Sequence, residues 1–307
     1  MSRILITGGA GFVGSNLINR LLLDGHSIVS VDDYSNGLIA NQVNGVNYLN
    51  FDIASEDSWI QVDGKNFDAV FHLAAQASNA VSFKNPAEDL KINQQATLNV
   101  IAFCQRENVK RLIFTSSMSV YGNPTIFPTP TSELPNPQTY YAIHKAASEK
   151  YISFSKNIDW TIFRLYTTYG SGQNLANLEQ GLVKIFLGYL LRGEPIKVHG
   201  SLDRVRDIIH VSDVVEALAT SLENKTSYQK IYNLGTGLTL TVGEIIEQIV
   251  SESRNAKTYP IIIESGDIGD PHKTQANIAD VQQDLEWRPK IGPSEGISRT
   301  ILNYLAK

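Results

Sequence analysis

Short apolar runs alternate with longer stretches of helical periodicity through the first half of the chain. Beyond residues 3–7, apolar runs cover 27–32, 46–51, 69–73, 111–116 and 160–165, and helical spacing is clearest over 14–24, 90–108 and 140–154. Runs that are apolar on both faces and alternate with helices are typical of a parallel sheet covered on both sides. The pattern therefore predicts a doubly wound α/β domain.

The pattern of alternating strands and helices changes after Tyr169. Shorter elements follow, among them predicted helices over 182–191 and 212–222 and a predicted strand over 196–199. No internal repeat and no low-complexity linker separates the two halves of the sequence. We expect residues 1–169 to form the parallel-sheet domain, with a return segment near 205–230, and residues 170–307 to form a smaller, partly interleaved domain.

Composition excludes several classes of protein. With 26 Lys and Arg against 31 Asp and Glu, the net charge is −5 and there is no basic stripe for nucleic acid. The apolar stretches are far shorter than the roughly 18–20 residues of a bilayer span, so we expect no signal peptide and no membrane partner. The single cysteine, Cys104, excludes a disulfide scaffold and is expected in the core. The sequence predicts a protein of a reducing compartment, most simply the cytoplasm.

A glycine-rich turn lies between the first predicted strand and the first predicted helix. Gly8, Gly11 and Gly14 recur there at intervals of three residues. Glycines at such a turn allow a tight bend, a close approach of backbone N–H groups to a pyrophosphate, and close packing of helix on strand. The helix N-terminus adds unpaired N–H donors for the same phosphate. Although glycine also marks ordinary turns, this position favours the dinucleotide site of a Rossmann domain.

An acidic residue ends the second predicted strand, where a Rossmann domain needs an acceptor for the adenosine ribose. Asp32 is the first candidate, in Val29-Ser30-Val31-Asp32-Asp33. Its carboxylate repels a 2′-phosphate and no arginine lies nearby in the sequence, so we expect NAD rather than NADP as the cofactor.

Further motifs follow in order along almost the whole chain. They are Asp52-Ile53, His72-Leu73-Ala74-Ala75-Gln76, Asn93, Thr115-Ser116-Ser117 with Val120-Tyr121-Gly122, Tyr141 with Lys145, Arg164, Tyr169-Gly170, Arg206-Asp207 with His210-Val211 and Asp213, Asn233-Leu234-Gly235 and Gly269-Asp270. With the glycine spacing, the series resembles the extended short-chain dehydrogenase/reductase family, and within it the NAD-dependent nucleotide-sugar epimerases and dehydratases of the UDP-glucose 4-epimerase-like type. The resemblance implies an NAD-binding Rossmann domain, a C-terminal domain that binds a nucleotide-diphosphate sugar, and a homodimer formed through 90–108 and 140–154.

The resemblance also implies which residues contact each ligand. Those implied for NAD are Gly8, Gly11, Phe12, Val13, Gly14, Asp32, Asn36, Asp52, Ile53, Leu73, Ala74, Ala75, Asn93, Tyr141 and Lys145. Those implied for the substrate are Ser117, Tyr141, Thr167, Val183, Arg206 and Asp270. The guanidinium of Arg206 suits bidentate binding of phosphate, and an ion pair with Asp203 or Asp207 is the alternative.

Tyr141 and Lys145 are the candidate proton-transfer pair. Four residues apart on a helix, they share one face, so the ammonium can lie beside the phenol and lower its pKa toward the working pH. A general base that removes a sugar hydroxyl proton needs such a pKa, and Ser117 at a strand end can bind the same hydroxyl. The spacing alone is weak because a chain with 13 tyrosines can hold such a pair by chance. Tyr140 is the neighbouring alternative, but His144 rather than a lysine follows it by four residues.

Several departures from the family pattern narrow the range of activities that the chain can have. Dehydratases of this type carry an Asp-Glu pair where Met118 and Ser119 stand, and the decarboxylases keep a Glu at the Ser119 position. Thr167 stands where many related epimerases have an asparagine that contacts phosphate. Residues 265–268 lack the arginine that often precedes Gly-Asp, and His272 or Lys273 is the alternative source of positive charge.

The sequence thus favours an NAD-dependent nucleotide-sugar 4-epimerase that acts through a transient 4-keto sugar, with Ser117, Tyr141 and Lys145 as catalytic residues. The alternatives are a 4-dehydrogenase that releases the keto sugar, a 4,6-dehydratase, and a non-catalytic NAD sensor. The six histidines show no metal-type clustering, so we predict no metal. His72 is expected to pack at a strand end and His210 to make a buried hydrogen bond.

Overall fold

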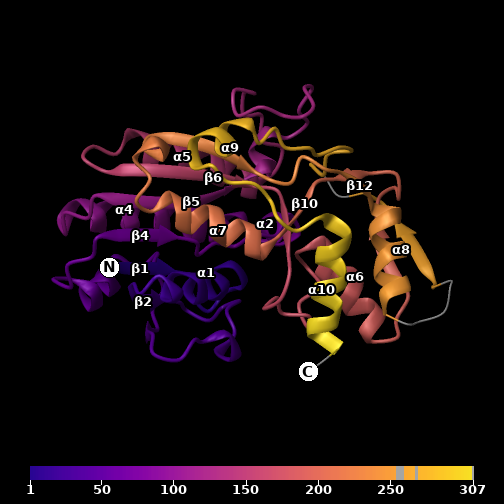
Figure 1. The fold of residues 1–307 in the computed structure, drawn as a ribbon, viewed down its shortest axis with the longest axis horizontal. Helices are drawn as coiled ribbons and strands as arrows, with labels where there is room; N and C mark the ends of the chain where they lie inside the picture. Colours follow the sequence, from indigo (N-terminus) through magenta and orange to yellow (C-terminus); the bar gives the residue numbers. More distant parts are fainter. Residues whose placement is uncertain (254–258, 267–268, 306–307) are drawn as a thin grey trace.

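A seven-stranded parallel sheet forms the centre of the computed structural model, which describes residues 1–253, 259–266 and 269–305 (Figure 1). The strand order is β11-β6-β5-β4-β1-β2-β3. The strands are β1 (Arg3–Thr7), β2 (Ser27–Val31), β3 (Asn47–Leu49), β4 (Ala69–His72), β5 (Arg111–Ser117), β6 (Asp159–Leu165) and β11 (Lys230–Leu234). Six of the seven coincide with the runs of the first half, which confirms the predicted doubly wound sheet.

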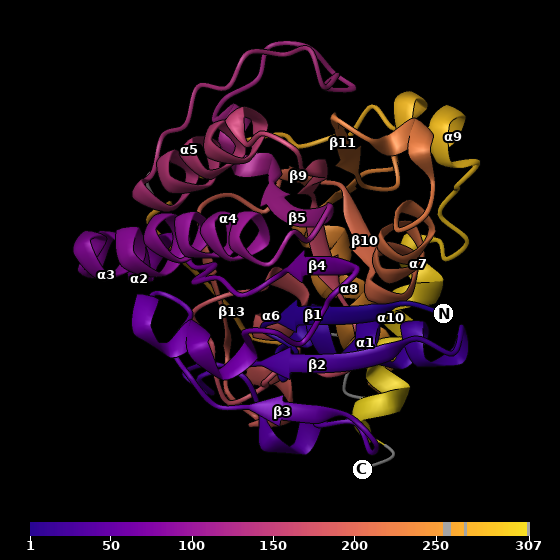
Figure 2. The same cartoon turned by 90° about the vertical axis from the view of Figure 1, so that its left-hand side faces the viewer.

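Helices cover both faces of the sheet because each central strand is apolar on both sides. Figure 2 shows α4 and α5 on one side and α7 and α9 on the other. The helices of the two layers are α1 (Phe12–Leu23), α2 (Asn79–Lys84), α3 (Pro86–Leu90), α4 (Ala96–Arg106), α5 (Tyr140–Phe154), α7 (Val211–Ser221) and α9 (Ala279–Leu285). Short 3₁₀ turns cover Ile39–Asn41, Glu56–Val62, Met118–Tyr121 and Lys225–Ser227.

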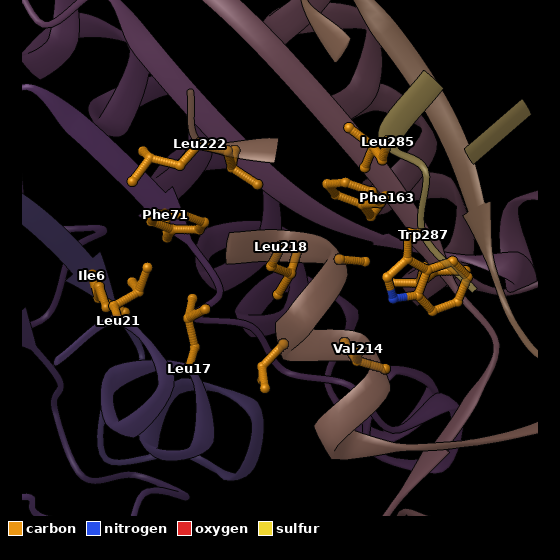
Figure 3. Close-up of a cluster of buried hydrophobic side chains, with 14 of the residues drawn as sticks. Ile6, Leu17, Leu21, Phe71, Phe163, Val214, Leu218, Leu222, Leu285 and Trp287 are labelled. Carbon is orange, nitrogen blue, oxygen red and sulfur yellow. The ribbon is translucent and has the colours of Figure 1, made fainter. Parts of the chain in front are cut away.

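Alternate residues of one strand enter two different cores. Ile4 and Ile6 pack with α1, α7 and Trp287 in the cluster of Figure 3, whereas Leu5 packs with α4 on the opposite face. Cys104 lies fully buried in that second core as a free thiol, as the sequence predicted.

The predicted helix over 90–108 is interrupted. A π-helical turn (Lys91–Gln95) lies between α3 and α4, and it contains the buried Asn93. Wide turns of this kind commonly occur at functional sites. Here the Asn93 amide donates to the Gln76 carbonyl at 3.0 Å and to Asp89 at 3.1 Å, so the turn joins α3 and α4 to the segment that follows β4.

The C-terminal half builds a third core beside the sheet, at the right of Figure 1. Its helices are α6 (Leu182–Leu191), α8 (Val242–Glu252) and α10 (Pro293–Leu305), and its strands are the parallel pair β8 (Ile196–His199) and β13 (Ile261–Glu264). The parallel pair β7 (Thr167–Tyr169) with β10 (Ile208–His210) and the antiparallel pair β9 (Val205–Arg206) with β12 (Leu240–Thr241) connect it to the sheet. The chain returns to the first core at α7 and β11, and again at α9 and Trp287.

Among the described residues, no helix combines the length and the apolar character needed to cross a bilayer.

Candidate active site

One long cavity of about 680 Å³ opens at the carboxyl ends of β1, β2, β4, β5 and β6 and extends to residues of the C-terminal half. Parallel sheets bind ligands at this edge, beside the point where the strand order reverses between β1 and β4. Most of the residues singled out in the sequence line it. They are Gly8, Gly11, Phe12, Val13, Gly14, Asp32, Asn36, Asp52, Ile53, Leu73, Ala74, Ala75, Ser117, Tyr141, Lys145, Thr167, Arg206 and Asp270.

Two of the singled-out residues lie elsewhere. Val183 is 1% exposed and packs in the third core, because it points from α6 toward α8 and β8, while its neighbours Leu182 and Lys184 line the cavity. The Val183 side chain therefore does not line the cavity, and a contact of this residue with substrate stays a prediction. Asn93 lies behind the lining residue Gln76 and holds its backbone carbonyl, so it is a positioning residue rather than a lining one.

The glycine-rich turn leaves no space for side chains toward the protein. A Cβ atom on Gly14 would lie 2.1 Å from the Gly8 carbonyl oxygen, and one on Gly8, at φ +77°, would lie 2.7 Å from the Ala74 nitrogen. Gly11 differs, since a Cβ there would meet only the Gly8 oxygen, at 3.1 Å, and would otherwise occupy the cavity. Gly11 is also the N-cap of α1 and provides no capping side chain. The three glycines thus form a cradle without side chains, and the free N–H groups of the first turn of α1 lie at its end, where they fit a pyrophosphate.

Asp32 stands at the other end of this cradle. Its carboxylate accepts hydrogen bonds of 2.9 Å from the backbone N–H groups of Ala10 and Tyr34. Burial raises the pKa of Asp32 above its usual value, and these backbone bonds oppose that shift. The two bonds fix the carboxylate at the cavity wall, where it can accept a hydrogen bond from a ribose hydroxyl.

Ser117, Tyr141 and Lys145 meet where β5 ends and α5 begins. The Thr139 hydroxyl caps α5 by accepting from the Ala142 N–H at 3.2 Å, which places Tyr141 in the first turn of the helix. The Tyr141 hydroxyl is hydrogen-bonded to Ser117, whose Oγ also accepts from the Ser119 hydroxyl at 2.9 Å. The Lys145 Nζ lies 4.3 Å from the centroid of the Phe114 ring. Tyr140, by contrast, is 41% exposed and packs edge-on against Phe83.

The pKa values of this trio differ from the sequence expectation. Burial raises the pKa of Tyr141 to about 12, although the hydrogen bond to Ser117 opposes the shift, and burial lowers the pKa of Lys145 to about 7. We expected Lys145 to lower the pKa of Tyr141, and the protein alone does not do so. The reason is that one enclosed site disfavours the charged form of both groups.

A buried Asp–His hydrogen bond and a buried ion pair, both missed by the sequence analysis, support the trio on the side away from the cavity. Asp89 is bonded to His144 and accepts from the lining residue Gln76 at 2.6 Å. Glu149 accepts from Arg164 at 2.7 Å and from the Ser116 hydroxyl, and it thereby joins α5 to β5 and β6. Glu149 lies one turn beyond Lys145 on α5 and raises its pKa against the effect of burial. Their partners lie 15 to 55 residues away in sequence, so local spacing held no signal for them.

Arg206 is almost fully buried, and its partner is neither of the expected aspartates. Its Nη2 donates to both oxygens of Asp270 at 2.8 Å, and Arg204 also pairs with Asp270. Its Nη1 donates to the backbone carbonyls of Val205 and His272. Neither His272 nor Lys273, the alternative sources of positive charge for the missing arginine, is among the residues that line the cavity. The Lys273 Nζ lies instead 4.8 Å from the centroid of the Phe127 ring.

The remaining candidates have structural roles. His72 hydrogen-bonds Thr7 at 2.8 Å and Thr97 at 3.1 Å, and burial lowers its pKa to about 3, so the ring is neutral. His210 caps α7 by accepting from the Ser212 N–H, which agrees with its predicted buried hydrogen bond. Within 1–253, 259–266 and 269–305, no group of three or more His, Cys, Asp or Glu residues is placed to hold a metal ion.

Comparison with known proteins connects this geometry to a family. The model of the NAD dependent epimerase/dehydratase family matches residues 4–235. A UDP-glucose 4-epimerase of Mycolicibacterium smegmatis is 31% identical over 311 residues, with 97% of each chain covered. Two solved structures cover 99% of both chains. One is a UDP-glucose 4-epimerase of Thermotoga maritima with UDP-glucose (TM-score 0.93, 32% identity), and the other is a UDP-glucose 4-epimerase of Thermus thermophilus in complex with NAD (TM-score 0.90, 30% identity).

Proposed function

The chain belongs to the NAD dependent epimerase/dehydratase family, and we propose that it is an NAD-dependent nucleotide-sugar 4-epimerase acting through a transient 4-keto sugar. One observation carries this proposal: Tyr141, whose hydroxyl is hydrogen-bonded to Ser117, lines the same cavity as the glycine cradle, together with Ser117 and Lys145. The names of the relatives favour a UDP-hexose as the substrate.

The residues of the cradle fit NAD. The free N–H groups at the N-terminus of α1, directly after Gly11, would hold its pyrophosphate, and the fixed carboxylate of Asp32 would hold the adenosine ribose. Bound NAD would supply the acceptor for the hydride of the sugar's C4 and, in its oxidised form, a positive charge. We propose the other lining residues of the Rossmann domain as its remaining contacts.

Tyr141 acts as the general base for the sugar's 4-hydroxyl. Positive charge near the phenol favours the phenolate and opposes the effect of burial. Ser117 binds the reacting oxygen and keeps it within reach of the Tyr141 hydroxyl, while Lys145 on the same helix face orients the cofactor ribose and contributes charge when protonated. After the 4-keto sugar rotates in the site, C4 takes the hydride back on its opposite face and Tyr141 returns the proton to the 4-oxygen. Both steps together give the C4 epimer and restore Tyr141 to its starting state.

The turn after Ser117 favours epimerisation over elimination. Met118 lines the cavity with an apolar side chain, and the Ser119 hydroxyl donates to Ser117. Neither residue supplies the carboxylic acid that would protonate a leaving 6-hydroxyl, as the dehydratases need. We propose that residues 170–307, apart from the segments that return to the sheet, bind the nucleotide, and that the enzyme acts in the cytoplasm.

Product analysis tests the proposed reaction. The NAD-loaded protein is incubated with UDP-glucose, UDP-galactose and UDP-N-acetylglucosamine, and products are followed by ¹H NMR together with absorbance at the NADH wavelength. We expect the C4 epimer of at least one sugar and no stoichiometric NADH. Accumulation of NADH with release of a ketone would identify a 4-dehydrogenase instead. Absence of isotope exchange at C4 with every sugar would indicate a non-catalytic NAD sensor.

We further propose a homodimer formed through α4 and α5. These helices lie side by side at the left of Figure 2. They expose the apolar residues Leu98, Ile143, Tyr151 and Phe154, and Leu90 at the end of α3 is exposed as well. Ile143, Tyr151 and Phe154 follow helical spacing on α5, so they form one stripe. A continuous apolar face rarely stays in contact with water, and a second copy of the same helices would bury it.

Charge on this stripe should separate the subunits. We expect Leu98→Glu combined with Ile143→Glu to give a monomer by light scattering at micromolar concentrations, because two carboxylates would be buried at the interface. Leu302→Glu, at an exposed apolar position on α10, is the matched control and should leave the dimer intact. A wild-type protein that is monomeric, or a double variant that stays dimeric, contradicts the proposal.

A further inference from the structure

Lys184 is a buried cation without a partner. It lies in the first turn of α6, is 3% exposed and lines the long cavity. Within the part of the chain that the structure describes, it makes no hydrogen bond and no ion pair. Burial is the single cause that lowers its pKa, to about 8, so no nearby carboxylate compensates the charge. An ammonium group held in this way is costly to the fold unless a ligand pairs with it.

Polar groups without hydrogen-bond partners also surround Lys184. Gln173 lines the same part of the cavity, and its side-chain oxygen is buried without a hydrogen-bond partner. A Cβ atom on Gly181 would lie 2.9 Å from the Gln173 Nε2 and 3.6 Å from the Lys184 Cε, so the two side chains flank this glycine. Gly181 is the N-cap of α6 and leaves the first N–H groups of the helix without a side-chain acceptor. A cation, an unpaired acceptor and a helix N-terminus therefore meet in one place.

The other cations of the cavity are already engaged. Arg206 donates both Nη groups to protein oxygens, chiefly those of Asp270. Lys145 lies against the Phe114 ring in the catalytic trio. Lys145 makes no hydrogen bond to a described residue, but this ring contact engages its ammonium. Of the three cationic side chains among the described lining residues, Lys184 is the one that makes no hydrogen bond, no ion pair and no ring contact.

We propose that Lys184 binds the diphosphate of the nucleotide-sugar substrate. This inference rests on the proposed function. The Lys184 ammonium supplies a positive charge that residues 265–268 lack, since no arginine precedes Gly269-Asp270 in this sequence. The helix N-terminus adds N–H donors to the same anion, and the Gln173 oxygen accepts from a hydroxyl of the ligand.

Binding measurements on three variants test the role of Lys184. Lys184→Met removes the charge at similar volume, Lys184→Arg keeps it, and Lys197→Met is the control at an exposed lysine paired with Glu264. The probes are UDP and uridine, titrated calorimetrically into the NAD-loaded protein. We expect Lys184→Met to weaken UDP roughly 10- to 100-fold, the usual range for a charged hydrogen bond. Uridine affinity should not change, and Lys184→Arg should stay within a few-fold of wild type.

Stability and kinetics distinguish a ligand-binding lysine from a structural one. Without ligand, Lys184→Met should melt at the same temperature as wild type or higher, because it removes an unpaired buried charge. Its KM should rise while kcat changes little, as expected when binding is lost equally from ground and transition states.

Three results overturn the assignment. If wild type and Lys184→Met bind UDP equally, the inference fails and the proposed function stands. If the variant loses NAD affinity rather than UDP affinity, Lys184 contacts the cofactor instead. If the wild-type protein binds UDP no better than uridine and turns over no nucleotide sugar, the proposed function fails together with the inference.

Discussion

Tyr141→Phe should lower kcat about 10²- to 10⁴-fold, the usual contribution of a positioned general base. The substitution removes one hydroxyl and keeps the ring that is buried in the first turn of α5, so the helix and the cavity wall remain. NAD should therefore stay bound, because the glycine cradle and Asp32 are untouched. The measurement is a steady-state assay with the substrate found active by NMR, together with NAD content determined after gel filtration.

Tyr140→Phe is the matched control. Tyr140 precedes the proposed base directly, is exposed and packs on Phe83, so removal of its hydroxyl should leave kcat within about two-fold of wild type. Near-normal turnover by Tyr141→Phe would refute the assigned base. Equal losses in both variants would point to a disturbed α5 rather than to lost proton transfer.

Elements with strong periodicity and clear end signals could be predicted from sequence. The structure places α5 over Tyr140–Phe154, α6 over Leu182–Leu191 and β8 over Ile196–His199, which are the predicted bounds. The segment 90–108 is helical over most of its length, as predicted, but the sequence contains no sign of the π-helical turn because the apolar spacing continues through it. Its wider backbone hydrogen bonding distinguishes this turn from regular helix, and Asn93 within it bonds to Gln76 and Asp89.

The topology of a parallel sheet predicts that the candidate site residues lie close together. Gly8, Asp32, Ser117 and Thr167 each follow or end a parallel strand, so their meeting at one sheet edge could be expected before any coordinates. The side-chain pairs that support them could not. Asp89 reaches His144 across 55 residues, and the partner of Arg206 proved to be Asp270 rather than a neighbour in sequence.

Charge states were the least predictable feature. The Tyr141 and Lys145 spacing predicts a favourable interaction between the two groups, but it carries no measure of how deeply they are buried. Burial reverses the expected pKa shift of Tyr141 in the protein alone. Burial also explains why Lys184 could not be predicted as a site residue. The sequence of an apolar helix does not show whether its lysine faces solvent, and the structure shows that Lys184 is buried at the cavity wall.

Two glycine substitutions should separate cofactor binding from stability. Gly14→Ala places a Cβ 2.1 Å from the Gly8 carbonyl oxygen, so the β1–α1 turn must shift. Overpacking of this kind costs about 1–3 kcal/mol or more, and we expect a lower free energy of unfolding by urea denaturation as well as lost NAD binding. Gly11→Ala adds its methyl group on the cavity side, at φ −76°, which alanine adopts without strain.

Gly11→Ala, whose Cβ would lie 3.1 Å from the Gly8 oxygen, should therefore lose much less stability than Gly14→Ala and still bind NAD poorly. If the same cost of about 1–3 kcal/mol applies between the new methyl group and the pyrophosphate, the Kd for NAD rises roughly 5- to 150-fold. Isothermal titration with NAD and urea unfolding, performed on both variants, measure the two quantities separately. Retention of wild-type NAD affinity by Gly11→Ala would place the pyrophosphate away from this turn. The glycine pattern would then serve only the packing of α1 on β1, and both the cofactor site and the reaction assigned to it would need another location.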